Sequence, residues 1–300
     1  MQNVVVTGAG SGFGLETTLE LVRRGHTVFA TMRDVQGRNH DVFADLQKRA
    51  DGLAGSLHVV EMDVTEDESV TRATGEIHSL EAKIHALVHS AGIAAGGFTE
   101  TFTPTDLQRL YDVNVVGIHR VSRAFLPGFR EQKRGVICVI SSTLGREVTP
   151  FLAPYVATKF ALQGFWEAFR YELYPHGIDT VMIQPGTFPT TKIVPNLLQP
   201  GDPARATGYP ELVPTVEGFF QGLADYASSG HAPEPLLVAE TIANVLEMKR
   251  EERPHQIVVD PNGPGGAKVL NEHADEVQKQ VLQSLQLSHL LPQTDKGTAK

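Results

Sequence analysis

The chain has 300 residues, of which 41% are hydrophobic and 20% charged, as in an ordinary globular protein. Its formal net charge of −9 argues against binding to nucleic acid or to an anionic membrane surface, because both need clustered cations. One cysteine excludes an intrachain disulfide and a cysteine zinc cluster, and scattered histidines favour no metal site. No stretch has the length of an apolar membrane span, and the first residues lack the pattern of a signal peptide. We therefore expect a cytoplasmic protein without a membrane span.

Short apolar runs alternate along the chain with helical patterns. We expect seven strands, at Asn3–Val6, His26–Thr31, Leu57–Met62, Ala86–Ser90, Val136–Ser141, Thr180–Gln184 and Gln256–Val259. Several are nearly continuous runs of valine and isoleucine, which are typical of parallel strands buried on both faces. Their alternation with helices predicts an α/β fold, a doubly wound parallel sheet of the Rossmann type with helices on both faces.

Two segments interrupt this alternation. Residues 187–235 hold 8 of the 18 prolines, and a connection of this length suits a lid over a substrate site. Residues 265–300 are expected to form a C-terminal helical extension that ends in a loose tail, Pro292–Lys300. The remainder, residues 1–264 including the lid, is expected to be a single dinucleotide-binding and catalytic domain.

A glycine-rich turn, Thr7–Gly14, follows the first expected strand and opens a helix. Its glycines allow a tight turn and close approach of the backbone to a phosphate, and the helix N-terminus offers free N–H groups. The spacing is not G-x-G-x-x-G, because the last position counted from Gly8 falls on Phe13. We interpret the turn as a dinucleotide site, with a purely structural turn as the alternative.

The end of the second expected strand indicates which dinucleotide is bound. A carboxylate there binds a ribose 2′-hydroxyl, whereas a nearby arginine accommodates the 2′-phosphate of NADP(H). The strand ends without an acid, and Arg33 follows directly. This pattern favours NADP(H). Two alternatives stay open, namely that Asp34 binds the hydroxyl of NAD(H) and that Arg33 is only a surface charge.

Tyr155 and Lys159 are four residues apart, so on a helix they share one face. A free tyrosine has a pKa near 10, and a nearby ammonium lowers it toward the range of a general acid/base. Ser142 follows the expected strand Val136–Ser141, at the edge of the sheet where open parallel sheets bind ligands. A hydroxyl there can bond a carbonyl oxygen, and Asn114 can order a water beside the lysine. A chance pairing of Tyr155 with Lys159 is the alternative if the pair is taken alone.

In this combination and order the motifs resemble the short-chain dehydrogenase/reductase family, in its compact single-domain branch. Thr7-Gly8-x3-Gly12-x-Gly14 and Tyr155-x3-Lys159 match its T-G-x-x-x-G-x-G and Y-x-x-x-K motifs. The resemblance extends to the catalytic serine and asparagine of the family, which correspond to Ser142 and Asn114. It also includes the adenine-contacting aspartate as Asp63, the P-G signature as Pro185-Gly186, and the threonine that holds the nicotinamide carboxamide as Thr190. The expected cofactor contacts are Gly8, Gly10, Ser11, Gly12, Phe13, Gly14, Arg33, Asp63, Val64, Ser90, Ala91, Gly92, Tyr155, Lys159, Pro185, Gly186, Phe188 and Thr190.

The resemblance implies a reaction in which hydride moves between a nicotinamide and a carbonyl carbon. Tyr155 would protonate the oxygen, and Ser142 would polarise it. Lys159 would lower the pKa of the tyrosine and bond the nicotinamide ribose, and Asn114 would hold a water that links Lys159 to solvent. An NAD(P)-binding regulator that has lost catalysis is the alternative, although all four catalytic positions are filled. A sugar-nucleotide epimerase or dehydratase is disfavoured, because its motif needs glycine where Ser11 stands.

One motif departs from the family. Its usual N-N-A-G is here His89-Ser90-Ala91-Gly92, which puts the bracing of the central sheet in doubt. We expect His89 to be a satisfied buried histidine near a strand end and not a ligand or base.

Apolar residues flank the expected site and favour a lipophilic alcohol or ketone. They are Leu144, Phe151, Leu152 and Ala94–Gly97, with Phe188, Tyr209, Leu212, Phe219 and Phe220 in the lid. The stretch Phe29–Asp34 also resembles the branch that contains 17β-hydroxysteroid and retinol dehydrogenases. The expected helices around Asp112–Phe125 and Pro154–Tyr174 have apolar residues on more than one face, which predicts a homodimer or homotetramer.

Overall fold

The computed structural model describes residues 1–80 and 83–290. The tail expected at Pro292–Lys300 lies outside the described residues. Within them, none of the helices is long and apolar enough to cross a membrane.

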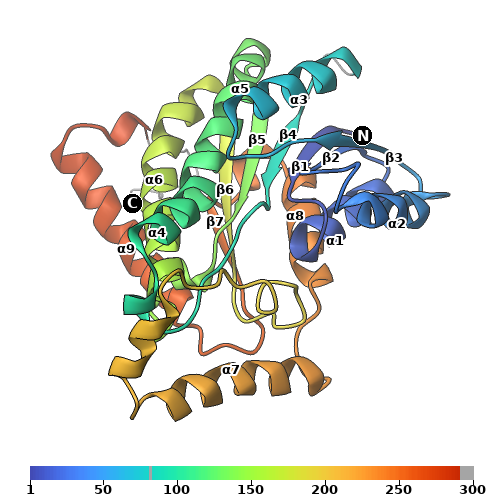
Figure 1. Cartoon of the computed structure of the whole chain (residues 1–300). Helices are drawn as coiled ribbons and strands as arrows, with labels where there is room; N and C mark the ends of the chain where they lie inside the picture. The colour runs from blue at the N-terminus through green and yellow to red at the C-terminus, as the bar shows by residue number, and fades with distance from the viewer. Residues whose placement is uncertain (81–82, 291–300) are drawn as a thin grey trace.

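The described chain contains a seven-stranded parallel sheet with the strand order β3-β2-β1-β4-β5-β6-β7 (Figure 1). The strands are β1 Asn3–Thr7, β2 Thr27–Met32, β3 Ser56–Glu61, β4 Ala86–His89, β5 Gly135–Ile140, β6 Ile178–Pro185 and β7 Gln256–Val259. Each of them overlaps a run expected from the sequence. Every residue of β2, β5 and β6 is buried, as the continuous apolar runs predict.

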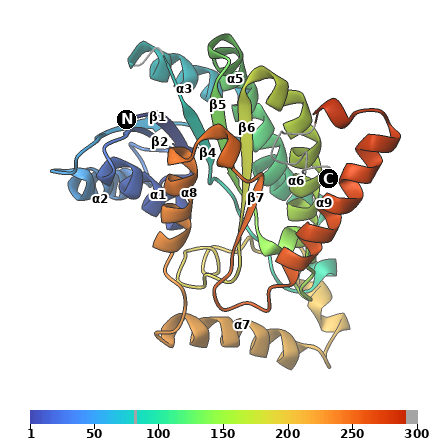
Figure 2. The same ribbon diagram turned by 180° about the vertical axis from the view of Figure 1, so that it is seen from behind.

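Helices cover both faces of this sheet, which confirms the Rossmann-like fold (Figures 1 and 2). On one face α1 Gly12–Arg23, α2 His40–Ala50 and α8 Leu236–Glu247 pack against residues such as Val4 and Val6. On the other face α3 Asp67–Leu80, α5 Gly117–Gln132 and α6 Ala153–Leu173 pack against residues such as Val5 and Leu87. Because neighbouring residues of a strand point to opposite faces, Val5 and its two neighbours belong to different halves of the core.

Three further helices lie outside these two layers. α4 Pro104–Tyr111 begins with a capping box, in which Thr103 and Asp106 bond each other's backbone N–H groups. α7 Val213–Ser228 lies at the carboxyl edge of the sheet within residues 187–235, which we call the lid segment (Figure 1). α9 Gly266–Ser284 runs beside α6, where Leu282 contacts Tyr171 (Figure 2). It is the helix expected in the C-terminal extension.

The helix expected around Asp112–Phe125 consists of two elements. Residues Asp112–Val116 form a π-turn, and α5 begins after it at Gly117. The turn contains Asn114, whose buried amide bonds the backbone of Ile93 and the hydroxyl of Thr158. π-Turns within helices often occur at functional sites. The periodicity of the sequence predicts the helical region but not this extra residue in the turn.

Candidate active site

The glycine-rich turn lies between β1 and α1, at the carboxyl edge of the sheet. Gly8 has a φ of +68°, and a Cβ there would lie 2.7 Å from the backbone of Ala91. A Cβ on Gly14 would lie 2.3 Å from the carbonyl oxygen of Gly8. Both positions therefore require glycine. The side chain of Ser11 does not cap α1, and its hydroxyl stays available to a ligand.

The end of β4 is braced by residues other than the asparagines of the usual motif. Thr7 Oγ1 accepts hydrogen bonds from the backbone N–H groups of Ser90 and Ala91, both at 3.2 Å. The His89 ring lies 2.9 Å from the hydroxyl of Ser122, and burial lowers the pKa of His89 to about 3. His89 is thus a neutral, satisfied residue of the core, as expected.

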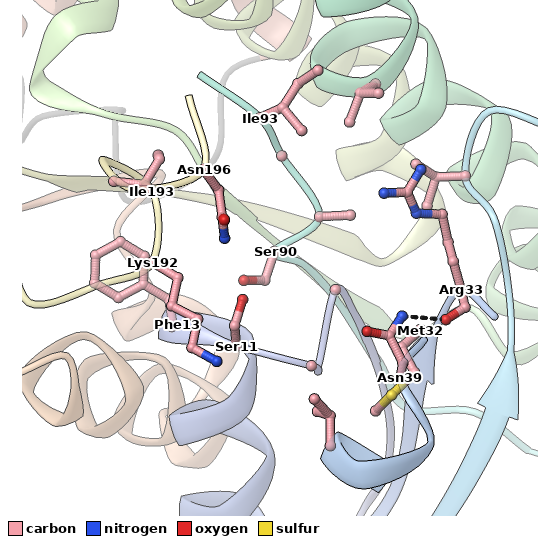
Figure 3. A pocket seen from close by; sticks show the side chains of 18 of the residues that line it. Ser11, Phe13, Met32, Arg33, Asn39, Ser90, Ile93, Lys192, Ile193 and Asn196 are labelled. Carbon is pink, nitrogen blue, oxygen red and sulfur yellow. Dashed lines mark hydrogen bonds between the residues drawn. The ribbon is translucent and has the colours of Figure 1, made fainter. Parts of the chain in front are cut away.

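A cavity of about 590 Å³ opens between the glycine-rich turn, the ends of β2 to β4 and the start of the lid segment (Figure 3). In this view Ser11, Ser90 and Asn196 point toward one another across the cavity. The expected cofactor residues that line it are Gly8, Gly10, Ser11, Gly12, Phe13, Arg33, Asp63, Val64, Ser90, Ala91 and Gly92. The structure therefore brings together residues from four separate regions of the sequence around one space.

Other expected cofactor residues lie outside this lining. Pro185 ends β6 beside Val259 of β7, and Gly186 continues this pairing by donating its N–H to the Val259 carbonyl oxygen at 3.0 Å, close to the carboxylate of Asp260. Phe188 is buried, and its ring meets that of Phe13 edge to face at 5.2 Å. Thr190 is turned toward the carbonyl of Pro233, and the neighbouring Thr191 lines the cavity instead. The remaining three residues outside the lining are Gly14, Tyr155 and Lys159.

At the end of β2, Arg33 lines the cavity and the next residue, Asp34, does not. Arg33 Nη1 lies 3.5 Å from Asp63 Oδ2, and both residues line the cavity. Partial burial raises the pKa of Asp63, but hydrogen bonds from Thr65 and the charge of Arg33 outweigh burial and lower it overall. Asp34 has a φ of +49°, and its carboxylate accepts a hydrogen bond from the backbone N–H of Arg38. It therefore closes the turn after β2 and does not line the cavity.

The sequence reasoning missed several residues that line the same cavity. They include Met32, Arg38, Asn39, Val42, Arg109, Lys192 and Asn196. For Arg38 a local signal exists, because Asp34 followed by Gly37 predicts a tight turn that returns the chain to the end of the strand. For Arg109 and Lys192 no local pattern points to a site, since tertiary packing alone places them there.

Ser142 and Tyr155 lie close together at the carboxyl end of β5, where the Ser142 hydroxyl acts on that of Tyr155. Ser142 also accepts a hydrogen bond from the backbone N–H of Leu144 at 3.1 Å, which orients its hydroxyl. Burial raises the pKa of Tyr155 to about 12, against the opposing effect of the Ser142 hydroxyl. This direction is opposite to the lowering expected from Lys159, because burial outweighs the other effects on this hydroxyl, and Tyr155 is neutral at pH 7.

Lys159 lies one helical turn after Tyr155 on α6, as the spacing predicts. Its Nζ donates to the carbonyl oxygen of Ile140 at 3.2 Å and lies 5.5 Å from the centre of the Tyr155 ring. Burial lowers the pKa of Lys159 to about 8. An ammonium with so few partners is available to a further oxygen atom, such as a ribose hydroxyl.

Asn114 holds the chain after β4 next to this cluster. Its Oδ1 accepts from the N–H of Ile93 at 2.9 Å, and its Nδ2 donates to the carbonyl of Ile93 at 2.8 Å and to Thr158 Oγ1 at 3.0 Å. Both amide protons are therefore used within the protein. The water expected beside Lys159 would have only the remaining capacity of Oδ1 or the backbone carbonyl of Asn114 to bond.

Aromatic side chains of the lid segment pack against the chain segments that follow β4 and that precede α6. Phe151 contacts Phe98 and Phe219, with ring centres 6.2 and 6.3 Å apart, and Tyr209 stacks on Phe98 at 5.0 Å. Phe220 lies against Gly96, where it leaves no room for a Cβ. Two residues expected in the apolar wall lie elsewhere, since Phe188 packs on Phe13 and Leu212 is 44% exposed.

Comparisons with known proteins match this architecture. Residues 2–199 match the family described as short chain dehydrogenase. The chain belongs to this family. The short-chain dehydrogenase match covers the glycine-rich turn and Ser142, Tyr155 and Lys159. The family includes oxidoreductases, and we therefore class the chain as an oxidoreductase.

Two relatives from the short-chain dehydrogenase family and one solved structure illustrate the sequence identity and the structural similarity. Uncharacterized oxidoreductase YusZ of Bacillus subtilis (strain 168) is 37% identical over 187 residues, which are 62% of this chain and 65% of that protein. Retinol dehydrogenase 8 of Homo sapiens is 30% identical over 258 residues, which are 83% of this chain and 79% of that protein. The structure of a variant of actinorhodin polyketide ketoreductase with NADPH has a TM-score of 0.69 and 25% identity, and it covers 88% of this chain and 97% of its own.

Proposed function

We propose that the protein interconverts an alcohol and a ketone or aldehyde, with NADP(H) as the preferred cofactor and a lipophilic molecule as the substrate. The observation that carries the proposal is the buried Ser142–Tyr155–Lys159 cluster at the sheet edge that also holds the glycine-rich turn and its cavity. The bound nicotinamide would supply or accept the hydride. The residues of the chain would position the carbonyl group and manage the proton.

Each residue of the cluster has a role that its surroundings support. Tyr155, with a pKa of about 12, keeps its proton at neutral pH and would donate it to the substrate oxygen. Ser142, which lies beside Tyr155, would donate to the same oxygen and favour its developing negative charge. Lys159 would stabilise the phenolate left behind, and Asn114 would position the backbone that holds a proton-relay water.

The preference for NADP(H) rests on the charges at the end of β2. Arg33 and Arg38 both line the cavity there, and Asp34 is occupied in the turn that it closes. Guanidinium groups bind phosphate oxygens with paired N–H donors, and a 2′-phosphate is the part of NADP(H) that NAD(H) lacks. Solved structures similar to this chain contain NADPH in the ketoreductase and NADH or NAD in others, so the preference rests on the arginines.

The lipophilic substrate class rests on the aromatic cover formed by Phe98, Phe151, Tyr209, Phe219 and Phe220. A binding site bordered by such rings and by the hydroxyls of Ser142 and Tyr155 would suit an apolar molecule that bears one oxygen. The likeness to retinol dehydrogenase 8 supports the same class.

We also propose a homodimer or homotetramer in the cytoplasm. Val116 and Phe160, on the helices expected to pair, are 45% and 43% exposed, and burial in a symmetric interface would remove them from water. The single cysteine, Cys138, is buried, and its lack of an intrachain disulfide partner is compatible with a reducing compartment.

A substrate panel tests the proposed activity. Purified protein would be assayed by absorbance of the reduced nicotinamide with NADP(H) and NAD(H), on lipophilic and polar alcohols and ketones, beside Tyr155→Phe. We expect turnover of lipophilic substrates that Tyr155→Phe abolishes, while cofactor binding stays within a few-fold. Binding of the cofactor without turnover of any panel member would favour a regulatory protein of the same fold.

A further inference from the structure

The start of the lid segment packs directly on the glycine-rich turn. The side chain of Thr191 lies 3.6 Å from the point where a Cβ of Gly12 would stand. Thr191 Oγ1 and its backbone N–H both bond the carbonyl oxygen of Phe188, and the Phe188 ring rests on Phe13. Two contacts thus hold this part of the lid segment above the turn, and they fix where the next residue, Lys192, leaves the backbone.

Lys192 extends from the lid segment into the cavity beside the turn. Figure 3 shows its side chain running toward Ser11 and Phe13, and all three residues line the cavity. Within the part of the chain that the structure describes, the Lys192 ammonium has no ion-pair or hydrogen-bond partner. Of the other cations that line the cavity, Arg33 faces Asp63 and Arg38 faces Asp34, whereas Arg109 lies on α4.

The glycine-rich turn itself contains no cation. Its backbone N–H groups can bond phosphate oxygens, but they cannot neutralise the two charges of a diphosphate. Lys192, an exposed residue above the turn, carries an ammonium that would supply the missing charge. Because Lys192 belongs to the lid segment and the turn belongs to the sheet, a diphosphate bound between them would tie the two parts together.

We propose that Lys192 binds the diphosphate of the dinucleotide and thereby latches the lid segment over the bound cofactor. This assignment rests on the proposed function. It differs from the contacts of Arg33 and Arg38, which lie at the adenosine end of the same cavity. It predicts a specific weakness in the variant without the ammonium, because dissociation of the dinucleotide, more than its association, should change.

The test is a set of binding measurements with three probes. NADP⁺ contains both the diphosphate and the 2′-phosphate, ADP-ribose contains only the diphosphate, and adenosine 2′-monophosphate contains only the 2′-phosphate. Calorimetry would give the Kd of each probe for wild type, Lys192→Ala and Lys192→Arg. Lys279→Ala, an exposed lysine of α9, is the matched control. Stopped-flow fluorescence would give the rate of NADPH dissociation.

We expect Lys192→Ala to weaken NADP⁺ and ADP-ribose alike by about five- to tenfold, the effect of one partly solvated charge-assisted contact. Adenosine 2′-monophosphate should bind as in wild type, the faster dissociation of NADPH should account for most of the loss, and Lys192→Arg should restore binding. Unchanged NADP⁺ binding by Lys192→Ala, or an equal loss for adenosine 2′-monophosphate, overturns the latch. Wild-type protein that binds neither NADP⁺ nor NAD⁺ overturns the proposed function as well, so the two failures are distinguishable.

Discussion

Replacement of the two arginines at the end of β2 should change which cofactor the protein uses. A charge-assisted contact with phosphate contributes about 1.5–3 kcal/mol when it is well shielded. The Arg33 side chain is 44% exposed and shares its charge with Asp63 at 3.5 Å, so we take the lower limit of about 1.5 kcal/mol, or about tenfold. Arg38 is 60% exposed, and solvent screening reduces its expected contribution to about 0.7 kcal/mol, or about threefold.

The assay is the ratio of kcat/KM for NADPH to that for NADH. We expect wild type to prefer NADPH, Arg33→Ala to lose about tenfold of the ratio, and Arg38→Ala to lose about threefold. Activity with NADH should stay within a few-fold. Arg49→Ala, which removes another surface arginine paired with Glu16, should leave the ratio unchanged. A tenfold preference of wild type for NADH would refute this reading of the strand end, and so would an unchanged ratio in Arg33→Ala.

The remaining predictions concern the chemistry and the turn. Ser142→Ala should lower kcat by about 10²–10³ in steady-state assays, while NADP⁺ binding stays within a few-fold. An unaffected kcat would instead assign the role to Ser141, whose buried hydroxyl has no partner among the described residues. Because burial lowers the pKa of Lys159 to about 8 from an ordinary 10.5, its charge is lost as the pH rises through about 8, and Tyr155 stays protonated there. Carbonyl reduction should therefore slow above pH 8 in a pH–rate profile, and a flat profile would contradict this role of the ammonium. Gly14→Ala should weaken NADP⁺ binding more than about tenfold and lower Tm, because a Cβ would lie 2.3 Å from Gly8 oxygen. Gly75→Ala in α3, where a Cβ meets nothing within 4 Å, is its control, and equal effects of the two changes would refute the argument.

Local sequence patterns suffice for the sheet and for much of the site. Continuous apolar runs mark strands buried on both faces, so β5 and β6 could be located within one or two residues. The i, i+4 spacing of Tyr155 and Lys159 places both on one helical face whatever the rest of the fold does. The steric limit at Gly14 is equally local, since it comes from Gly8 in the same turn, whereas the limit at Gly8 comes from Ala91 after β4 and is a contact between distant segments.

Features that depend on contacts between distant segments could not be predicted in this way. Phe188 belongs to a run of apolar lid residues, but its ring packs on Phe13, which is 175 positions earlier, and so leaves the substrate wall. Lys192 is one of many surface-type lysines until Thr191 is known to rest on Gly12. Asp34 was an open candidate for a ribose hydroxyl, and only its left-handed backbone shows that its carboxylate closes a turn.

The π-turn at Asp112–Val116 sets the rotation of α5 about the helix axis relative to α4. One surplus residue in a helix rotates everything after it by about 100° relative to an unbroken α-helix. α4 can therefore direct Arg109 to the cavity and Asp106 to the backbone of Gly201, while α5 presents Val121 and Phe125 to the sheet. Removal of a single residue from the turn would put both helices back in phase, and they could not keep both sets of contacts. The turn thus allows α4 to direct a side chain to the cavity while α5 directs its apolar side chains to the core.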